Sequence, residues 1–493
     1  MRKGLLPLAA ALVATGVLAG AAAGAYQAPE SALTATAATY ACATPAPTVH
    51  YTWIHCYTPQ DVRSAYGVDA LGDPSTGTGL LGQGQTIVLV DSYGEPTGAQ
   101  DLQAFHDAFY PGLPDPDYTA VYPNGQPDFK NVGNGQSGSS GAAGWAGEAA
   151  LDIEWAYAIA PLAHIVLIGV PPAETEGVQG FPNLFKAISD QIDANPAGTV
   201  FSMSFGVTEE TFGGAAQNQT AKFDAVFEKG IAKGDTFFAS SGDSGTLGVS
   251  KQQRDSRTYD HPTAGWPASS PYVTAVGGTQ LQYGWTWNPQ SDVAFTADGN
   301  YNPDYWQSTA GGNTNVVWNE SWLPAATGGG PSAIYPRPSW QAGVLPDQGD
   351  HRLVPDVAWN AAVNGGVLVY TSFFPSVSRV GWHIYGGTSA ASPQVAALTA
   401  LAAQKAGHGL GNVNPAIYAA GGTGLTDVAP VHEGAAGVIS GDLTTNRMFD
   451  YDGDGNSVTW DAIPGWPVLA GYDMTTGWGT PDAAAYVAAL AGS

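Results

Sequence analysis

The sequence feature that most restricts the fold is a series of short, almost wholly apolar runs separated by helical stretches. The first run covers residues 85–91 and ends in a carboxylate, and similar runs follow at residues 164–170, 199–204, 235–240, 272–276 and 366–370. Such runs are typical of parallel strands that are buried on both faces. Helical stretches between them cover residues 147–159, 184–192 and 221–233. This alternation predicts an α/β domain with a doubly wound, mainly parallel sheet and helices on both faces.

Residues 280–340 interrupt the alternation. This stretch is rich in Trp, Asn, Gly and Pro, and we expect a long loop excursion there. The chain shows no internal repeat and no clear second core. We therefore predict one domain over residues 57–493.

The charge of the chain excludes several classes of partner. It has 16 Lys and Arg against 42 Asp and Glu, a net charge of −26. Nucleic-acid backbones and anionic membranes are bound by clustered Lys and Arg, which this sequence lacks. With 15 Trp, 22 Tyr and 16 Phe, the chain can bury a large core. We expect a globular protein that does not bind nucleic acid.

Residues 1–25 are predicted to be a secretory signal peptide. Arg2 and Lys3 precede an apolar stretch over residues 5–23, and small residues lead to Ala25. An uncleaved membrane anchor is the alternative, because about 20 apolar residues can span a bilayer. The Ala and Gly content favours cleavage, and therefore a secreted, extracellular protein without membrane attachment.

Residues 26–56 are predicted to be a linker, since they are rich in Ala, Thr and Pro and show no periodicity. They contain both cysteines of the chain, Cys42 and Cys56. Export to an oxidising compartment favours a disulfide between them. Two free thiols are the alternative.

The strongest local motif is the run from Gly386 to Pro393, which reads Gly-Gly-Thr-Ser-Ala-Ala-Ser-Pro. The glycines permit a tight turn, after which Ser389 lies at a helix N-terminus. Pro393 falls early in that helix, where its missing N–H costs little. A serine at the positive end of a helix dipole suits a nucleophile that attacks a carbonyl group. An ordinary Ser N-cap is the alternative.

A serine nucleophile needs a base, but none of the nine histidines lies in a His-Gly-[Ser/Thr]-x-Val-Ala type of helix start. The chain offers instead Glu148 and Asp152, at i and i+4 of a predicted helix and about 40° apart on it. Two acids held together share a proton, so that one can be the general base to Ser389 while the other orients it. A solvated acidic helix face is the alternative, although Ala, Leu, Ile and Trp flank the pair.

Asp243 is a third candidate, because it follows a predicted strand in the Gly-bounded turn Ser-Gly-Asp-Ser-Gly. The carboxyl end of a strand in an α/β sheet is where ligands bind. A carboxylic acid that stays protonated can donate a hydrogen bond to a developing oxyanion. An Asx-turn residue is the alternative.

In this order the three motifs resemble the sedolisin family of serine-carboxyl peptidases. The motifs are Glu148-x-x-x-Asp152, the run Ser-Ser-Gly-Asp-Ser-Gly at residues 240–245, and Gly387-Thr-Ser-Ala-x-x-Pro393. Supporting matches lie at residues 57–63, 269–279, 327–330 and 355–358. The resemblance extends over residues 57–490.

The resemblance implies a subtilisin-like fold and a Ser/Glu/Asp triad. Ser389 would be the nucleophile, Glu148 the general base and then acid, and Asp152 its orienting partner. Asp243 would take the oxyanion-hole position. An acyl-enzyme would form on Ser389, and a carboxylate base implies an optimum at acidic pH.

The family also carries a calcium site near the C-terminus. By similarity, its ligands here would be the carboxylates of Asp427 and Asp473 and the carbonyl groups of Val428 and Gly471, oxygen donors that suit a hard cation. A second calcium ion is an open alternative at residues 450–461, where Asp450 to Asp461 has the twelve-residue calcium-loop spacing. A solvated acidic turn explains that spacing equally well.

The sequence departs from the family pattern in three places. Residues 26–56 are too few for the long prodomain that most sedolisins carry. Phe205 stands where relatives often have Trp, and Asp91 stands at a strand end where some relatives hold a longer acid. The part of Asp91 in catalysis is therefore left open.

We predict a secreted, acid-active serine-carboxyl endopeptidase that acts on proteins or peptides. One alternative is a tripeptidyl-peptidase of the same family, and another is a catalytically silent binding protein on the same scaffold. The missing His motif argues against a true subtilase or another acyl hydrolase. The sequence leaves subsite preference open, and a monomer is the default expectation.

Overall fold

The computed structural model describes residues 56–126, 142–170, 177–248, 259–287, 306–320, 325–363, 365–373, 380–431, 443–448 and 463–492. The predicted signal peptide, Cys42 and the possible calcium loop at 450–461 lie outside these residues. Cys56 is disulfide-bonded. None of the helices in the described part is both long and apolar enough to cross a bilayer.

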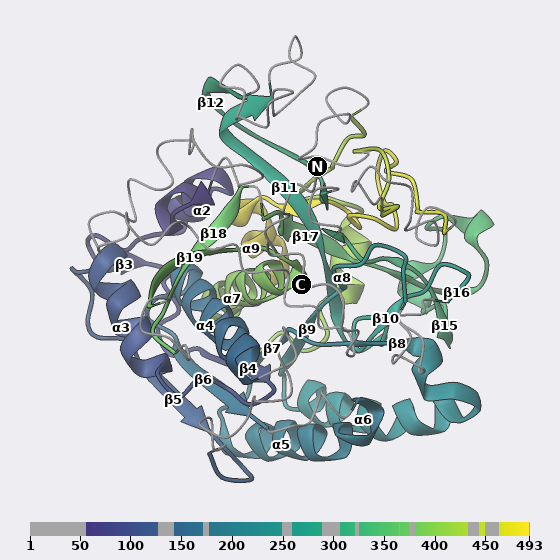
Figure 1. Cartoon of the computed structure of the whole chain (residues 1–493), viewed down its shortest axis with the longest axis horizontal. Coiled ribbons are helices and arrows are strands. Elements are labelled where there is room, and N and C mark those ends of the chain that lie inside the picture. The colour runs from purple at the N-terminus through teal and green to yellow at the C-terminus, as the bar shows by residue number, and fades with distance from the viewer. Residues whose placement is uncertain are drawn as a thin grey trace, which may run out of the picture.

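An eight-stranded sheet forms the centre of the molecule (Figure 1). Its strands follow the order β12-β11-β9-β7-β4-β6-β5, and β17 also pairs with β11. All neighbours are parallel except β11 and β12. The strands are β4 (Thr86–Asp91), β5 (Tyr118–Val121), β6 (His164–Gly169), β7 (Val200–Met203), β9 (Thr236–Ser240), β11 (Thr274–Trp287), β12 (Trp306–Val317) and β17 (Val357–Asn360). The prediction of a mainly parallel sheet is confirmed.

Helices cover both faces of this sheet, which explains why its strands are almost wholly apolar. In β4, Ile87 and Leu89 belong to one hydrophobic core, whereas Val88 and Val90 belong to the other. The first core packs against α4 (Ala142–Ile159), α7 (Thr388–Ala406) and α9 (Ala483–Ala491), and the second against α5 (Phe181–Ala194) and α6 (Ala216–Ala232). Figure 1 shows α5 and α6 below the sheet and α4 and α7 above it.

A separate three-stranded sheet corrects one strand assignment. The apolar run at residues 366–370 forms β18 (Gly366–Thr371), which pairs with β1 (Cys56–Tyr57) and β19 (Gly381–Tyr385) rather than with the central sheet. Its apolar character reflects burial against α3 (Gly98–Phe109) and α4. An apolar run therefore indicated burial correctly, but not the sheet to which the strand belongs.

The expected loop at residues 280–340 is also wrong in part. β11 continues to residue 287 and pairs with β12 as an antiparallel hairpin. Further short strands follow at β13 (Asn319–Glu320), β14 (Ala325–Ala326) and β15 (Gly330–Pro336), the last paired with β16 (His351–Val354). The Trp and Thr residues of this stretch favour strands, and its Gly and Asn residues obscured that preference.

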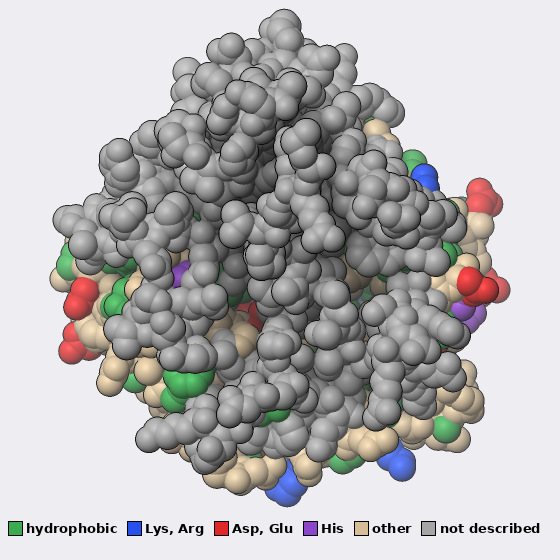
Figure 2. All heavy atoms as spheres, viewed as in Figure 1, with side chains coloured by type: hydrophobic (Ala, Val, Ile, Leu, Met, Phe, Trp, Pro, Cys, Tyr) green, Lys and Arg blue, Asp and Glu red, His purple; other side chains and the backbone are tan. Residues whose placement is uncertain are grey.

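Short elements connect these layers. The helix α2 (Pro59–Ala65) begins with a capping box in which Thr58 and Asp61 satisfy each other's backbone N–H. The remaining elements are β2 (Gly72–Asp73), β3 (Thr78–Gly79), β8 (Val207–Thr208), β10 (Gly265–Trp266), β20 (Leu425–Thr426), β21 (Thr480–Pro481), α8 (Asn414–Ala420), and the 3-10 helices η4 (Val68–Ala70), η5 (Gly177–Gln179), η6 (Glu209–Ala215), η8 (Ser339–Gln341) and η9 (Pro346–Gln348). On the face shown in Figure 2, the visible basic side chains are scattered at the margins, as the acidic composition predicts.

Candidate active site

The candidate site lies where the carboxyl ends of the central strands meet the N-terminus of α7. The strand order reverses beside β4, because the chain passes from β4 to β5 and β6 on one side and then to β7 and β9 on the other. Ligands bind outside the carboxyl ends of strands at such a reversal. Asp91 ends β4, and Asp243 follows the end of β9.

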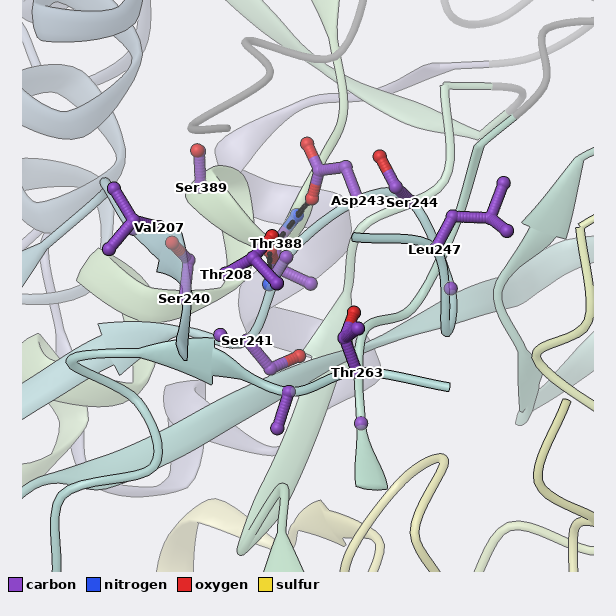
Figure 3. Close-up of a pocket in the computed structure, with 16 residues that line it drawn as sticks. Val207, Thr208, Ser240, Ser241, Asp243, Ser244, Leu247, Thr263, Thr388 and Ser389 are labelled. Carbon is purple, nitrogen blue, oxygen red and sulfur yellow. Dashed lines mark hydrogen bonds between the residues drawn. The ribbon is translucent and has the colours of Figure 1, made fainter. Parts of the chain in front are cut away.

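A pocket opens to solvent at this point (Figure 3). The residues that line it are Gly206, Val207, Thr208, Ser240, Ser241, Gly242, Asp243, Ser244, Gly245, Leu247, Thr263, Ala264, Gly265, Gly329, Thr388 and Ser389. The lining joins the predicted nucleophile and the predicted oxyanion residue. It includes no histidine.

Ser389 is the second residue of α7, and its side chain is buried at the edge of the pocket. Gly387, the residue that precedes the helix, has φ 101°, a conformation that favours glycine. The turn therefore brings Ser389 to the first turn of the helix, where the dipole favours negative charge. Its position is the one that the motif predicted.

Pro393 lies deeper in α7 than we expected. The helix begins at Thr388, so Pro393 is its sixth residue and lies beyond the first turn. At that position its missing N–H leaves the carbonyl group of Ser389 without its i→i+4 hydrogen bond. The expectation that the proline costs little is wrong, because the sequence did not show where the helix starts.

Glu148 lies on α4 and is almost completely buried. Burial raises its pKa well above the usual range, and the charges of Asp91 and Asp243 raise it further. The Ser389 hydroxyl acts in the opposite direction, as a donor that favours the carboxylate. Within the described residues, neither oxygen of Glu148 has a hydrogen bond of ordinary geometry. Catalytic hydrogen bonds are often long in a free enzyme and shorten when substrate binds.

Asp152 lies one helical turn further along α4 and is also fully buried. The Ser204 hydroxyl, just after β7, donates a hydrogen bond to its Oδ1 at 2.9 Å. This hydrogen bond fixes the carboxyl group of Asp152, which lies on the same helix as Glu148. Because both acids are buried, the alternative of a solvated acidic helix face is wrong.

Asp91 belongs to the same group of acids, a role that the sequence left open. Burial raises its pKa to about 8, and its charge in turn raises the pKa of Glu148. Neither oxygen has a hydrogen-bond partner among the described residues. The one sequence signal was the apolar strand that ends in a carboxylate, since such an acid lies at the ligand-binding edge of the sheet.

Asp243 is held by the start of α7. Its Oδ1 accepts hydrogen bonds from the backbone N–H of Thr388 at 2.8 Å and from the Thr388 hydroxyl at 2.7 Å. Its Oδ2 has no such partner among the described residues, and burial raises the pKa of the acid to about 6. The acid therefore bonds to a distant element, and the Asx-turn alternative is wrong.

A glycine-rich strip, residues 327–330, clamps the loop that carries Asp243. The Gly328 N–H donates to the Gly242 carbonyl at 2.7 Å, and a Cβ on Gly328 would lie 2.2 Å from the Ser241 carbonyl oxygen. On the other side, a Cβ on Gly329 would lie 2.0 Å from the carbonyl oxygen of Met474. The glycine-rich strip thus packs closely against two loops, and at Gly328 and Gly329 neither loop leaves room for a side chain.

A second group of buried acids lies behind the site, between α3, α4 and β18. Glu154 accepts a hydrogen bond from the Tyr370 N–H at 2.9 Å, and Asp101 accepts one from the Ser372 N–H at 2.8 Å. Burial, followed by the interaction with Asp101, raises the pKa of Glu95 well above its usual range. We call Glu95, Asp101 and Glu154 the rear acid group.

Tyr385 lies between the two groups. Its pKa is raised first by burial and then by the charges of Glu148, Glu95 and Glu154. A Cβ on Gly147, the neighbour of Glu148, would lie 2.4 Å from the Tyr385 hydroxyl. Tyr385 therefore packs closely against the backbone beside Glu148, a contact that nothing in the sequence indicated.

Phe205 lies in an aromatic cluster, with its ring centroid 6.0 Å from that of Phe181. A phenylalanine has no N–H with which to join a network of acids. Phe205 therefore contributes packing to this cluster and no hydrogen bond.

The segments predicted to hold calcium lie side by side. The Gly471 N–H donates to Asp427 Oδ2 at 2.8 Å, and the Leu469 N–H donates to Asp473 Oδ2 at 3.0 Å. Asp473 Oδ1 accepts hydrogen bonds from Thr475 and Thr476. No group of three or more His, Cys, Asp and Glu side chains in the described part is placed to bind a metal ion. The oxygen donors and their proximity nevertheless fit a hard cation held by two carboxylates and carbonyl groups.

Comparison with known proteins agrees with this arrangement. Residues 142–420 match the subtilase family. Kumamolisin from Bacillus sp. (strain MN-32) is 32% identical over 372 residues, which cover 73% of this chain and 55% of the relative. Sedolisin from Pseudomonas sp. (strain 101) is 30% identical over 63% of this chain and 43% of its own length. Tripeptidyl-peptidase 1 from Homo sapiens is 28% identical over 68% of this chain and 50% of its own length.

A solved structure shows the same fold. Pseudomonas sedolisin, a serine-carboxyl proteinase solved in complex with pseudo-iodotyrostatin, superposes with a TM-score of 0.62 and 25% identity. The match covers 89% of this chain and 98% of that one. In the sequence comparisons, by contrast, the match spans about half the length of the curated relatives, 55% of kumamolisin and 50% of tripeptidyl-peptidase 1. The chain belongs to the subtilase family and is sedolisin-like within it.

Proposed function

We propose that this protein is an acid-active serine-carboxyl endopeptidase that hydrolyses peptide bonds through an acyl-enzyme on Ser389. One observation carries the proposal. The nucleophile lies at a pocket whose neighbouring titratable groups are the buried acids Glu148 and Asp243, whose pKa values are both raised. Carboxyl groups would thus do the proton transfer that histidine does in other serine peptidases.

In the first step, Ser389 Oγ bonds to the substrate carbonyl carbon while its proton passes to Glu148. The electrons of the C=O bond move to the oxygen, and protonated Asp243 donates a hydrogen bond to it. The intermediate then expels the amine, which takes the proton from Glu148. Water repeats the sequence on the acyl-enzyme and releases the acid product.

We expect an optimum at acidic pH because this cycle needs bound protons on some of the acids. Glu148 must be free to accept a proton while Asp243 holds one. The group of acids must therefore be partly protonated, with fewer bound protons than carboxyl groups. Their mutual repulsion and burial raise the pKa values, so the required protons remain bound at moderately acidic pH. As pH rises, Asp243 loses its proton and the oxyanion loses its donor.

We also propose a calcium ion held by Asp427, Asp473 and the carbonyl groups of Val428 and Gly471. The proximity of these segments supports it. A bound calcium ion would supply structural cross-linking of the two segments. The ion would have no part in the proton transfers.

Export is a further part of the proposal. The support is the signal-like segment at residues 1–25 and the disulfide at Cys56, a bond that is stable in oxidising compartments. We expect a monomer whose partners are its protein or peptide substrates.

The test is hydrolysis of a denatured protein and of a peptide with a blocked N-terminus, from acidic to neutral pH. We expect cuts inside the blocked peptide at acidic pH, and loss of activity in Ser389→Ala and Glu148→Gln. Cleavage of unblocked peptides alone would instead identify a tripeptidyl-peptidase. A folded wild type that is inactive at every pH would overturn the proposal and favour a binding protein.

A further inference from the structure

We propose that Thr388 is a positioning residue that decides which oxygen of Asp243 carries the proton. This inference rests on the proposed function, in which Asp243 donates to the oxyanion. Thr388 directly precedes Ser389, the nucleophile of that proposal, and lines the same pocket. The geometry indicates that its backbone N–H and hydroxyl group also orient Asp243.

Both donors of Thr388 converge on one oxygen of Asp243. The backbone N–H lies 2.8 Å and the hydroxyl oxygen 2.7 Å from Oδ1. A carboxyl group accepts hydrogen bonds best at its carbonyl oxygen and donates from its hydroxyl oxygen. The proton of neutral Asp243 therefore belongs on Oδ2.

The Thr388 hydroxyl cannot easily reverse this arrangement. Its oxygen accepts a hydrogen bond from the Gly242 N–H at 3.1 Å, and an N–H can only donate. The hydroxyl hydrogen is thus free to point at Asp243 Oδ1. The backbone N–H of Thr388 also points there, and two donors on one oxygen disfavour a proton on it.

The other oxygen of Asp243 has no hydrogen-bond partner among the described residues. Figure 3 shows Asp243 at the pocket near Ser389, with one carboxyl oxygen bonded to Thr388 and the other directed away from it. That second oxygen, Oδ2, is buried. A proton placed on it can be donated to the oxyanion, whereas a proton on Oδ1 would face the two donors of Thr388.

Thr388 also influences when Asp243 ionises. Its backbone and hydroxyl donors both lower the pKa of Asp243, against the larger effect of burial. The charged group that interacts with Asp243 from the facing helix α4 is Glu148. Removal of the Thr388 hydroxyl should therefore raise the pH at which Asp243 loses its proton, while the proton becomes less well directed.

The test compares Thr388→Val, which removes the hydroxyl at nearly constant shape, with Thr388→Ser, which keeps it. In Thr388→Val we expect kcat to fall by about tenfold to a hundredfold with little change in KM. We also expect the fall of kcat with rising pH to begin at higher pH. Thr388→Ser should restore both values.

A matched control is Thr399→Val, on the same helix. The Thr399 hydroxyl is buried and donates to the Val395 carbonyl at 2.9 Å, so the variant loses a comparable hydrogen bond away from the pocket. It should lose stability without a shift of the pH profile. Thermal unfolding of every variant shows whether it is folded.

The outcomes separate this inference from the proposed function. If wild-type activity survives in Ser389→Ala, the proposed function fails. If activity depends on Ser389 but Thr388→Val keeps the wild-type kcat, or loses kcat without any shift of the pH profile, the inference about Thr388 is overturned. A lower kcat with a shifted profile, restored by serine, supports it.

Discussion

Asp243 is the residue whose proton sets the upper pH limit of the proposed reaction. Its pKa is raised to about 6 by burial, against the two Thr388 donors, and it must be neutral to donate to the oxyanion. Activity should therefore fall as pH rises through about 6. Below that value the acid remains protonated.

Replacement of Asp243 tests this limit. In Asp243→Asn, the side-chain carbonyl oxygen should accept from Thr388, which leaves the NH2 group as a donor at every pH. We expect Asp243→Asn to lose the fall near neutral pH, and Asp243→Ala to lose kcat by about 100- to 1,000-fold at all pH values. Profiles of kcat against pH measure both. The same pH limit in Asp243→Asn and wild type would assign it to another acid.

At this scale the sequence predicted the residues but not their contacts. The positions of Ser389, Glu148 and Asp243 follow from local motifs, because a helix start and an i,i+4 spacing are local features. The contact between Thr388 and Asp243 joins residues 145 positions apart, and no local pattern encodes it. Asp91 was visible as the end of a strand, but its burial beside Glu148 was not.

The part of α4 that carries Glu148 makes a close contact with a strand. Gly147 on α4 faces Tyr385 at the end of β19, and the space between them does not hold a methyl group. Gly-to-Ala changes inside helices normally gain up to about 1 kcal/mol. At Gly147, the contact with Tyr385 should instead make the change to Ala lower the free energy of unfolding.

We expect Gly147→Ala to destabilise the fold by about 1–3 kcal/mol and to lower kcat, because the added Cβ meets the Tyr385 hydroxyl beside Glu148. Tyr385→Phe removes that oxygen, so the double variant should recover stability. Gly214→Ala is the control, since nothing lies within 4 Å of its Cβ. Urea unfolding of the four variants measures these effects. If the contact is unimportant, the effects of Gly147→Ala and Tyr385→Phe on the free energy of unfolding will simply add in the double variant.

Element prediction succeeded where burial and periodicity agree and failed where they do not. β4 is buried on both faces and was predicted almost to the residue. β18 has the same apolar character but joins another sheet, since burial does not reveal the pairing partner. The β11–β12 hairpin was missed because Gly and Asn interrupt its strand pattern.

The whole molecule should be most stable at acidic pH. Burial raises the pKa of Glu95 and Glu154 above their unfolded values near 4.5, so the folded state keeps protons that the unfolded state loses. This contribution is fully present below about 4.5 and is lost as pH rises towards the folded pKa values. The midpoint of urea unfolding should therefore fall steadily from acidic to neutral pH.

Glu154→Gln tests how much the rear acid group contributes to the pH dependence of stability. Glutamine keeps an oxygen for the Tyr370 N–H but cannot ionise, so the variant should lose less stability with rising pH than wild type. Asp347→Asn, at an exposed position in η9, is the control and should leave the slope unchanged. Equal slopes in all three proteins would show that the rear acid group does not titrate in this range.

Calcium should stabilise the molecule if Asp427 and Asp473 hold it. At a calcium concentration of about 100 times Kd, the free energy of unfolding should rise by about 2.7 kcal/mol, and a chelator should reverse the gain. Asp427→Asn should reduce the difference in Tm. Asp482→Ala, which removes the N-cap of α9, should lower Tm without changing the response to calcium. A chelator without effect on wild type would contradict the site.

The glycine-rich strip also bears on the order in which the protein matures. Gly328 rests on the loop of Asp243, and Gly329 rests on the Met474 carbonyl near the end of the chain, with the Thr327 hydroxyl bonded to the Thr475 carbonyl at 3.0 Å. The loop of Asp243 therefore lacks its outer support until residues 474–475 have been synthesised and folded. A nascent chain that already contains Ser389 would therefore still lack part of the support of the Asp243 loop.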